Sequence, residues 1–137
     1  DEFNDSPKQG DFLIRNIIGV DAQKGVLAVG EQLKEGQTVQ FHLRDSKTSS
    51  QDLDAMLERY MTDRTTHRES GALLFQCLGR GEYLYGRADH DTDMFKEIVG
   101  DLPLTGFFCN GEIGPVGGST FLHGYTSSFG IFRPKEG

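Results

Sequence analysis

The chain has 137 residues, of which 36% are hydrophobic and 26% are charged, so its length fits one domain rather than two. Its formal net charge of −7 would repel a nucleic acid or an anionic membrane, and neither is an expected partner. The sequence contains no apolar run of the ~18 residues that a membrane-spanning helix needs. The amino terminus also lacks a signal-peptide pattern, so we expect a soluble, cytoplasmic domain without membrane insertion.

A change of composition at Asp11 marks the expected domain boundary. Residues 1–10 are polar and contain both Pro and Gly, which is typical of a linker or of the remnant of a preceding domain. Residues 11–137 are predicted to form the domain itself. Cys77 and Cys109 lie inside apolar runs without paired motif spacing, which favours reduced thiols over a disulfide framework.

Three strands are predicted in the first third of the chain. The run 11–21 is β-rich, and a polar loop ending in Gly25 joins it to a second apolar run at 26–29 as a hairpin. The run 38–45 alternates apolar with polar side chains, which is typical of a half-buried strand. In the first strand, the side chains expected inside are Phe12, Ile14, Ile17 and Ile18.

The middle of the chain is predicted to hold two helices around a central strand. Apolar side chains recur at helical spacing through 48–63, where Thr48 and Gln51 have the spacing of a capping box. The apolar run 71–77 lacks alternation, which suits a strand buried on both faces and parallel to the strand before the helix. A second, shorter helix is expected within 91–101.

Two β-rich runs, 103–114 and 119–134, close the chain and are predicted to form a terminal hairpin around a Gly-rich segment. The order of elements is then βββαβαββ. It describes an α+β domain with a single mixed β-sheet and two helices, which right-handed crossovers can place on one face. The other face would need a cover, and a second domain could supply it.

Two charged residues stand beside glycines at the ends of predicted strands. Glu112 follows an apolar run at a point where backbone amides can approach a ligand, and its carboxyl group could pair with an ammonium. Arg80 follows the central strand, where α/β folds usually bind ligands, and suits a carboxylate or a phosphate. Two alternatives stay open: a turn that leaves Glu112 solvated, and a structural ion pair of Arg80.

Three polar residues of the first and third predicted strands are weaker candidates: Arg15, Asn16 and Arg44. If these strands pair, the two arginines reach the same rim of the sheet. The alternative is a buried Arg–Asp bridge that fixes the register of the strands.

Cysteine and histidine side chains offer a further chemistry. Cys109 and His123 suggest a Cys–His nucleophile, but a catalytic thiol needs electropositive surroundings, whereas Cys109 suits a small core residue. The acidic stretch 89–93 is interpreted as a helix N-terminus rather than a cation site. No cofactor or metal is predicted, because the histidines lack metal-ligand spacing: His42, His67, His90 and His123.

Four segments carry a resemblance to a known family. In chain order they are FLIRNIIGVD, ALLFQCLGRG, GFFCNGEIGPVGG and FLHGYTSSFGIFRP. With them the chain resembles, over residues 11–134, the C-terminal half of the FIST sensory domain of F-box and intracellular signal-transduction proteins. The resemblance implies a domain that binds a small ligand such as an amino acid or a related metabolite. It also implies a FIST N-terminal domain as partner, and the chain departs from the family's pattern in lacking that half.

The leading hypothesis is therefore a sensory domain that is not an enzyme and binds a small polar ligand in signal transduction. The opposite charges of Arg80 and Glu112 would complement a zwitterion. The residues expected at the pocket are Arg80, Asn110, Glu112 and His123, followed by Arg15, Asn16 and Arg44.

Two alternatives belong to other functional classes. The first is a protein-interaction module that recruits a partner through the aromatic side chains of Tyr83, Tyr85 and Phe121. The second is a hydrolase or transferase that uses Cys109 and His123.

Overall fold

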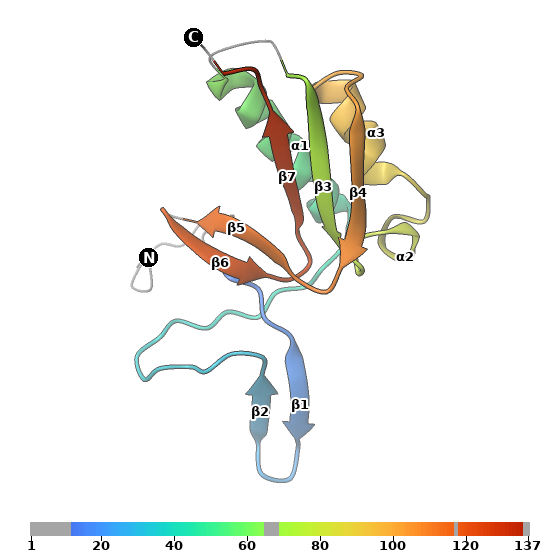
Figure 1. The fold of residues 1–137 in the computed structure, drawn as a ribbon. Helices are drawn as coiled ribbons and strands as arrows, with labels where there is room; N and C mark the ends of the chain where they lie inside the picture. The colour runs from blue at the N-terminus through green and yellow to red at the C-terminus, as the bar shows by residue number, and fades with distance from the viewer. Residues whose placement is uncertain (1–11, 65–68, 117, 136–137) are drawn as a thin grey trace.

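Figure 1 shows the computed structural model, which describes residues 12–64, 69–116 and 118–135. The linker predicted at 1–10 and the histidine at position 67 lie outside these ranges. Within them, no helix combines the length and the apolar character needed to cross a bilayer.

A three-stranded sheet forms the centre of the fold. β3 (Gly71–Cys77) is its middle strand, as predicted, and pairs in parallel with β4 (Leu104–Cys109) and antiparallel with β7 (Ser127–Phe132). The helices α1 (Ser46–Asp63) and α3 (His90–Ile98) cover one face of this sheet (Figure 1). The carboxyl ends of β3 and β4 therefore meet at one rim of the sheet, where the polar residues discussed below gather.

The hydrophobic core lies between the sheet and the two helices. Leu53 and Leu57 of α1 are buried there, together with Ala72 of β3 and with Phe95, which is 0% exposed and stacks on the ring of Phe129 at 5.2 Å. The helical spacing of the apolar residues in α1 and α3 thus points one stripe of each helix at the same face of the sheet.

The helix predicted at 48–63 is confirmed and begins slightly earlier. Its N-cap is Asp45, whose carboxylate accepts hydrogen bonds from the backbone N–H (2.9 Å) and the hydroxyl (2.7 Å) of Thr48. Thr48 is therefore the donor in this cap rather than the capping residue. A carboxylate satisfies these free N–H groups well, and the hydrogen bonds lower the pKa of Asp45.

Residues 12–43 form an arm, whose β1–β2 part extends away from the central sheet (Figure 1). The predicted hairpin is confirmed, with β1 (Ile17–Asp21) antiparallel to β2 (Val26–Val29). The burial predicted for its side chains is wrong for Ile17 and Ile18, which are 51% and 69% exposed. Among the described strands, β1 and β2 pair only with each other, so these two side chains do not enter the core between the central sheet and the helices.

No strand forms at 38–45, where the alternating pattern predicted one. Period-two alternation makes a strand only where a neighbouring strand supplies hydrogen bonds, and no described strand pairs with this segment. Consequently β3 is parallel to β4, the strand that follows it across α3, and not to a strand before α1.

The two carboxyl-terminal runs divide into four strands. The inner pair, β5 (Glu112–Val116) and β6 (Ser119–His123), forms the predicted antiparallel hairpin, whereas β4 and β7 flank β3. The described strands thus form three separate sheets rather than one, and a short additional helix, α2 (Glu82–Tyr85), follows β3. The α+β class is confirmed, and the order of elements roughly matches the predicted one.

Candidate functional site

Glu112, a predicted site residue, is buried at the start of β5 with 1% of its surface exposed. Its Oε2 accepts hydrogen bonds from the backbone N–H (3.3 Å) and the hydroxyl (2.9 Å) of Thr126. The Cys109 thiol donates to its Oε1 over 3.4 Å. Within the part of the chain that the structure describes, no Lys or Arg forms an ion pair with Glu112. The alternative of a solvated turn residue is therefore wrong.

A cavity of about 500 Å³ opens beside Glu112. Helix α1 forms one wall, β7 forms another, and the β5–β6 hairpin forms the third. The polar part of the lining comprises Glu112, His123, Thr126, Ser127 and Ser128. The apolar part includes Leu57, Tyr60, Phe129 and Ile131. Two predicted site residues, Glu112 and His123, therefore share one cavity, whose volume suits a small molecule.

Arg80 is also buried, with 5% of its surface exposed, and pairs with a carboxylate of the protein itself. Its Nε lies 2.8 Å from Oδ2 of Asp91, which is 1% exposed, and its Nη1 donates to the backbone oxygen of Tyr125 at 3.3 Å. Asp91 also accepts hydrogen bonds from Gln76 (2.8 Å) and Ser127 (2.7 Å). The structural ion pair, one of the two interpretations of Arg80, is thus the one observed.

Arg44 reaches the same rim from the segment before α1. Its guanidinium donates to the backbone oxygen of Gly79 at 2.9 Å and lies 4.1 Å from the centre of the Tyr125 ring. A side chain at Gly79 would collide with both groups. Tyr125 itself has φ +63°, a conformation that costs energy for a bulky residue and recurs at functional sites.

The other predicted candidates lie elsewhere. Arg15 pairs with Glu31 at 2.8 Å, and the backbone oxygen of Asn16 accepts from Gly30, so both belong to the arm. The prediction that Arg15 and Arg44 reach the same rim required pairing between the strands predicted at 11–21 and 38–45. The second of these strands does not form. Asn110 is exposed in the turn between β4 and β5.

Cys109 and His123 are each bonded to other groups. The Cys109 thiol donates to Glu112 and to the backbone oxygen of Gln76, and His123 Nε2 lies 2.9 Å from the backbone oxygen of Gly114. Burial and the neighbouring Glu112 raise the pKa of Cys109, the opposite of what an activated thiolate requires. Both cysteines are free thiols, and the described residues contain no cluster of His, Cys, Asp or Glu suited to a metal ion.

Asp91 is the main residue of this region that the sequence interpretation missed. It lay within an acidic stretch interpreted as a helix N-terminus, and α3 does begin there, at His90. The available signal was its position four residues before Phe95, because residues at this spacing share one helix face and Phe95 lies on the buried face. An acid on the apolar face of a helix indicates a buried partner.

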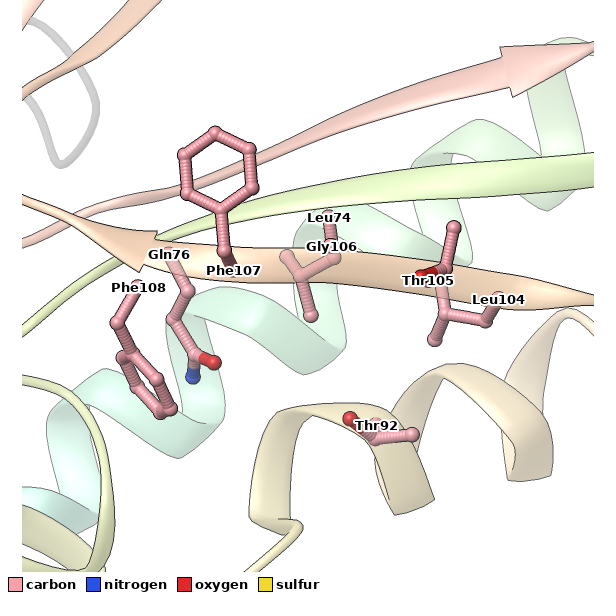
Figure 2. A pocket seen from close by; sticks show the side chains of 8 residues that line it. All are labelled: Leu74, Gln76, Thr92, Leu104, Thr105, Gly106, Phe107 and Phe108. Atoms are coloured by element: carbon pink, nitrogen blue, oxygen red, sulfur yellow. The ribbon is translucent and has the colours of Figure 1, made fainter.

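A second cavity, of about 310 Å³, lies between β4 and α3 (Figure 2). Figure 2 shows Phe108 and Thr92 on the helix side of β4, whereas Phe107 points to the other side. The lining of this second cavity, which includes Gly106, Leu74 and Leu104, carries no ionisable side chain. A ligand that must be recognised by charge therefore fits the cavity beside Glu112 better.

Comparison with protein families gives a match over most of the chain. The model of the FIST C domain matches residues 3–115. The chain belongs to this family. The recognition of a FIST C-terminal domain from four short sequence segments is thereby confirmed.

The relatives of this FIST C domain are longer proteins. The chain is 44% identical over 132 residues to an uncharacterized protein of Mycobacterium bovis, matching 96% of the chain and 34% of that protein. It is 27% identical over 101 residues to F-box only protein 22 of Homo sapiens, covering 73% and 25% respectively. An F-box/LRR-repeat protein of Arabidopsis thaliana is 26% identical over 142 residues, covering 93% and 27%. The chain thus spans about a third or less of each relative.

Proposed function

We propose that this FIST C domain is a cytoplasmic sensory domain that binds a small ligand in the cavity beside Glu112. The observation that carries the proposal is a buried carboxyl group without a cationic partner among the described residues, at the wall of a cavity of about 500 Å³. Thr126 and Cys109 donate hydrogen bonds to this carboxyl group, but none of these donors carries a positive charge. An ammonium group of a ligand would supply the opposite charge that compensates a buried carboxylate.

The lining of the cavity defines the class of ligand. The end at Glu112 offers hydrogen-bond acceptors and hydroxyl groups, whereas α1 and β7 contribute apolar surface. We therefore infer an amine or an amino acid with an apolar side chain. A zwitterion held between Arg80 and Glu112 is not supported, because Asp91 already occupies the Arg80 guanidinium and Arg80 is not part of the lining.

The position of the cavity also suggests how binding becomes a signal. Its walls belong to α1, to β7 and to the β5–β6 hairpin, and a hydrogen bond of 3.2 Å from the Ser128 hydroxyl to the Ile113 backbone oxygen links the hairpin to β7. A ligand that touches all three walls stabilises one position of the hairpin. Sensing requires that the ligand binds one position of the hairpin more tightly than another.

A thermal-shift screen tests the proposal. The probes are L-leucine, L-phenylalanine and 2-phenylethylamine, with 3-phenylpropionic acid as an amine-free comparison. A ligand at 100 times its Kd adds about 2.7 kcal/mol to the free energy of unfolding, which corresponds to several degrees of melting temperature. We expect an amine to raise the melting temperature and the acid to leave it unchanged.

Glu112→Gln decides whether the shift arises at this cavity. The variant keeps the shape of the side chain and removes its charge, so we expect about tenfold weaker amine binding or more, since hydrogen bonds to charged groups contribute about 1.5–3 kcal/mol. Glu58→Gln, on the exposed side of α1, is the matched control and should bind like the wild type. An amine shift of equal size in a folded Glu112→Gln variant would contradict the proposal.

Protein binding is a second candidate, favoured by the exposed apolar side chains of the arm. Val39, Phe41 and Leu43 are 57%, 73% and 96% exposed, and Ile18 and Val20 of β1 are exposed as well. Apolar patches of this kind mark interaction surfaces, and the partner we propose is a FIST N-terminal domain. Of the aromatic residues considered from sequence, Tyr83 is fully exposed, whereas Tyr85 stacks on His90.

Phe41→Glu tests this interface. We expect it to abolish co-purification with a co-expressed FIST N-terminal domain of a longer relative, because a charge cannot enter an apolar interface without cost. Glu35→Gln, in the exposed part of the arm, is the control and should co-purify normally. Unchanged co-purification of Phe41→Glu would rule out this surface as the interface.

A further inference from the structure

Three side chains between α1 and α3 form a hydrogen-bonded chain that the ligand-binding function does not use. The Ser50 hydroxyl oxygen in α1 lies 2.7 Å from Nε2 of His90, the first residue of α3. Nδ1 of the same imidazole lies 2.8 Å from Oδ1 of Asp91. This is the order of contacts in a Ser–His–Asp triad: the hydroxyl meets one ring nitrogen and the carboxylate meets the other.

We propose that Ser50, His90 and Asp91 form an acyl-transfer site that hydrolyses small carboxylic esters. Ser50 is the nucleophile, His90 is the general base, and Asp91 is a positioning residue that fixes the imidazole. The proposal goes beyond ligand binding and departs from the expectation of a domain that is not an enzyme.

The charge and the hydrogen bonds of the Asp91 carboxylate suit this role. Burial alone would raise the pKa of Asp91, but the hydrogen bond and the positive charge of Arg80 outweigh burial and lower it. The carboxylate is thus ionised near neutral pH. Its Oδ2 accepts hydrogen bonds from Arg80, Gln76 and Ser127. Its Oδ1 lies 2.8 Å from His90 Nδ1 and also accepts a longer hydrogen bond of 3.4 Å from Nη2 of Arg80. An anionic acceptor at Nδ1 keeps the proton on that nitrogen and leaves Nε2 free to accept the proton of Ser50.

The imidazole is also held by an aromatic ring. Tyr85 stacks on His90 with a centroid separation of 3.5 Å and an angle of 3° between the rings. Stacking restricts rotation of the imidazole, and the face of an aromatic ring attracts a cation. Tyr85 and Asp91 together therefore stabilise the imidazolium that forms when His90 takes a proton. Ser50 and His90 are both partly exposed, and the His90 side chain keeps 11% of its surface exposed.

The reaction that this arrangement supports has two stages. The Ser50 oxygen attacks the ester carbonyl while its proton passes to His90 Nε2, and the ester C–O bond breaks as His90 gives that proton to the leaving alcohol. Water then attacks the acyl-serine, with His90 taking the water proton and returning it to Ser50. The products are one carboxylic acid and one alcohol, with water as the only co-reactant.

Labelling with a fluorophosphonate probe tests the proposal in the wild-type chain. This probe phosphonylates activated serine hydroxyls and releases fluoride. We expect labelling at Ser50, identified by mass spectrometry, and a rate at least 100-fold lower in Ser50→Ala and His90→Gln, because general base catalysis contributes about 10²–10⁴-fold. Ser49→Ala removes the neighbouring hydroxyl and should label like the wild type.

Melting curves of each variant separate chemistry from stability. If the Ser50–His90 hydrogen bond only connects α1 to α3, Ser50→Ala and His90→Gln would lower the melting temperature, and the folded wild type would not be labelled. Absence of labelling in the folded wild type, or an equal rate in folded Ser50→Ala, would overturn the proposal. The amine-induced thermal shift is measured without the probe and depends on Glu112, whereas labelling depends on Ser50, so either proposal can fail while the other stands.

Discussion

Replacing Asp91 by Ala is expected to lower the free energy of unfolding by about 3–5 kcal/mol, because removal of one partner of a buried ion pair leaves the other charge uncompensated. In this case the Arg80 guanidinium, only 5% exposed, would lose its carboxylate. Gln76 and Ser127 would lose the same acceptor. Urea denaturation followed by circular dichroism measures the change.

Asp93→Ala is the matched control, two residues further along α3. Asp93 pairs with Arg87 at 2.6 Å, but both side chains are about half exposed. Exposed ion pairs contribute about 0–1 kcal/mol, so the control should stay within that range. Equal losses from Asp91→Ala and Asp93→Ala would show that the buried pair contributes no more to stability than a surface pair.

The same carboxylate predicts a dependence of stability on pH. The folded-state pKa of Asp91 is lowered below the unfolded value of about 3.9, so its stabilisation is complete above that value and is lost as the pH falls through the folded pKa. We expect the stability difference between the wild type and Asp91→Asn to shrink below about pH 4. A difference that grows on acidification would contradict this assignment.

Phe95→Ala is expected to cost about 3–5 kcal/mol, because it removes a fully buried aromatic side chain and leaves a cavity. The ring also loses its stacking on Phe129, which connects α3 to β7. Phe132→Ala, at a position 56% exposed, is the control and should cost no more than about 1 kcal/mol. Urea denaturation of both variants compares them, and a loss in Phe95→Ala no greater than in Phe132→Ala would place the core elsewhere.

Local sequence patterns predicted the helices and the strand that are stabilised by burying a stripe or a continuous run of apolar side chains. The helix at 48–63, the central strand at 71–77 and the second helix were predicted because their apolar residues face a common core. The segment 38–45 shows where such patterns fail. Its alternation resembles that of a half-buried strand, but no described strand offers it hydrogen bonds, and Phe41 remains exposed.

The candidate site was predicted in part, and the difference has a physical cause. Glu112 and His123 stood out through local context, and the structure brings them to one cavity. The partners of Arg80 could not be predicted from the sequence, because they depend on tertiary packing. Asp91 is separated from Arg80 by 11 positions along the chain, and Tyr125, whose backbone oxygen Arg80 contacts, by 45. A charge can be recognised from sequence, but whether a ligand or the protein neutralises it depends on the fold.

A crystal structure of the chain with the amine that gives the largest thermal shift tests the central claim most directly. The account predicts the ligand between α1, β7 and the β5–β6 hairpin, with its nitrogen within hydrogen-bond distance of the Glu112 carboxyl group. A ligand bound elsewhere, or a nitrogen directed away from Glu112, would contradict the account.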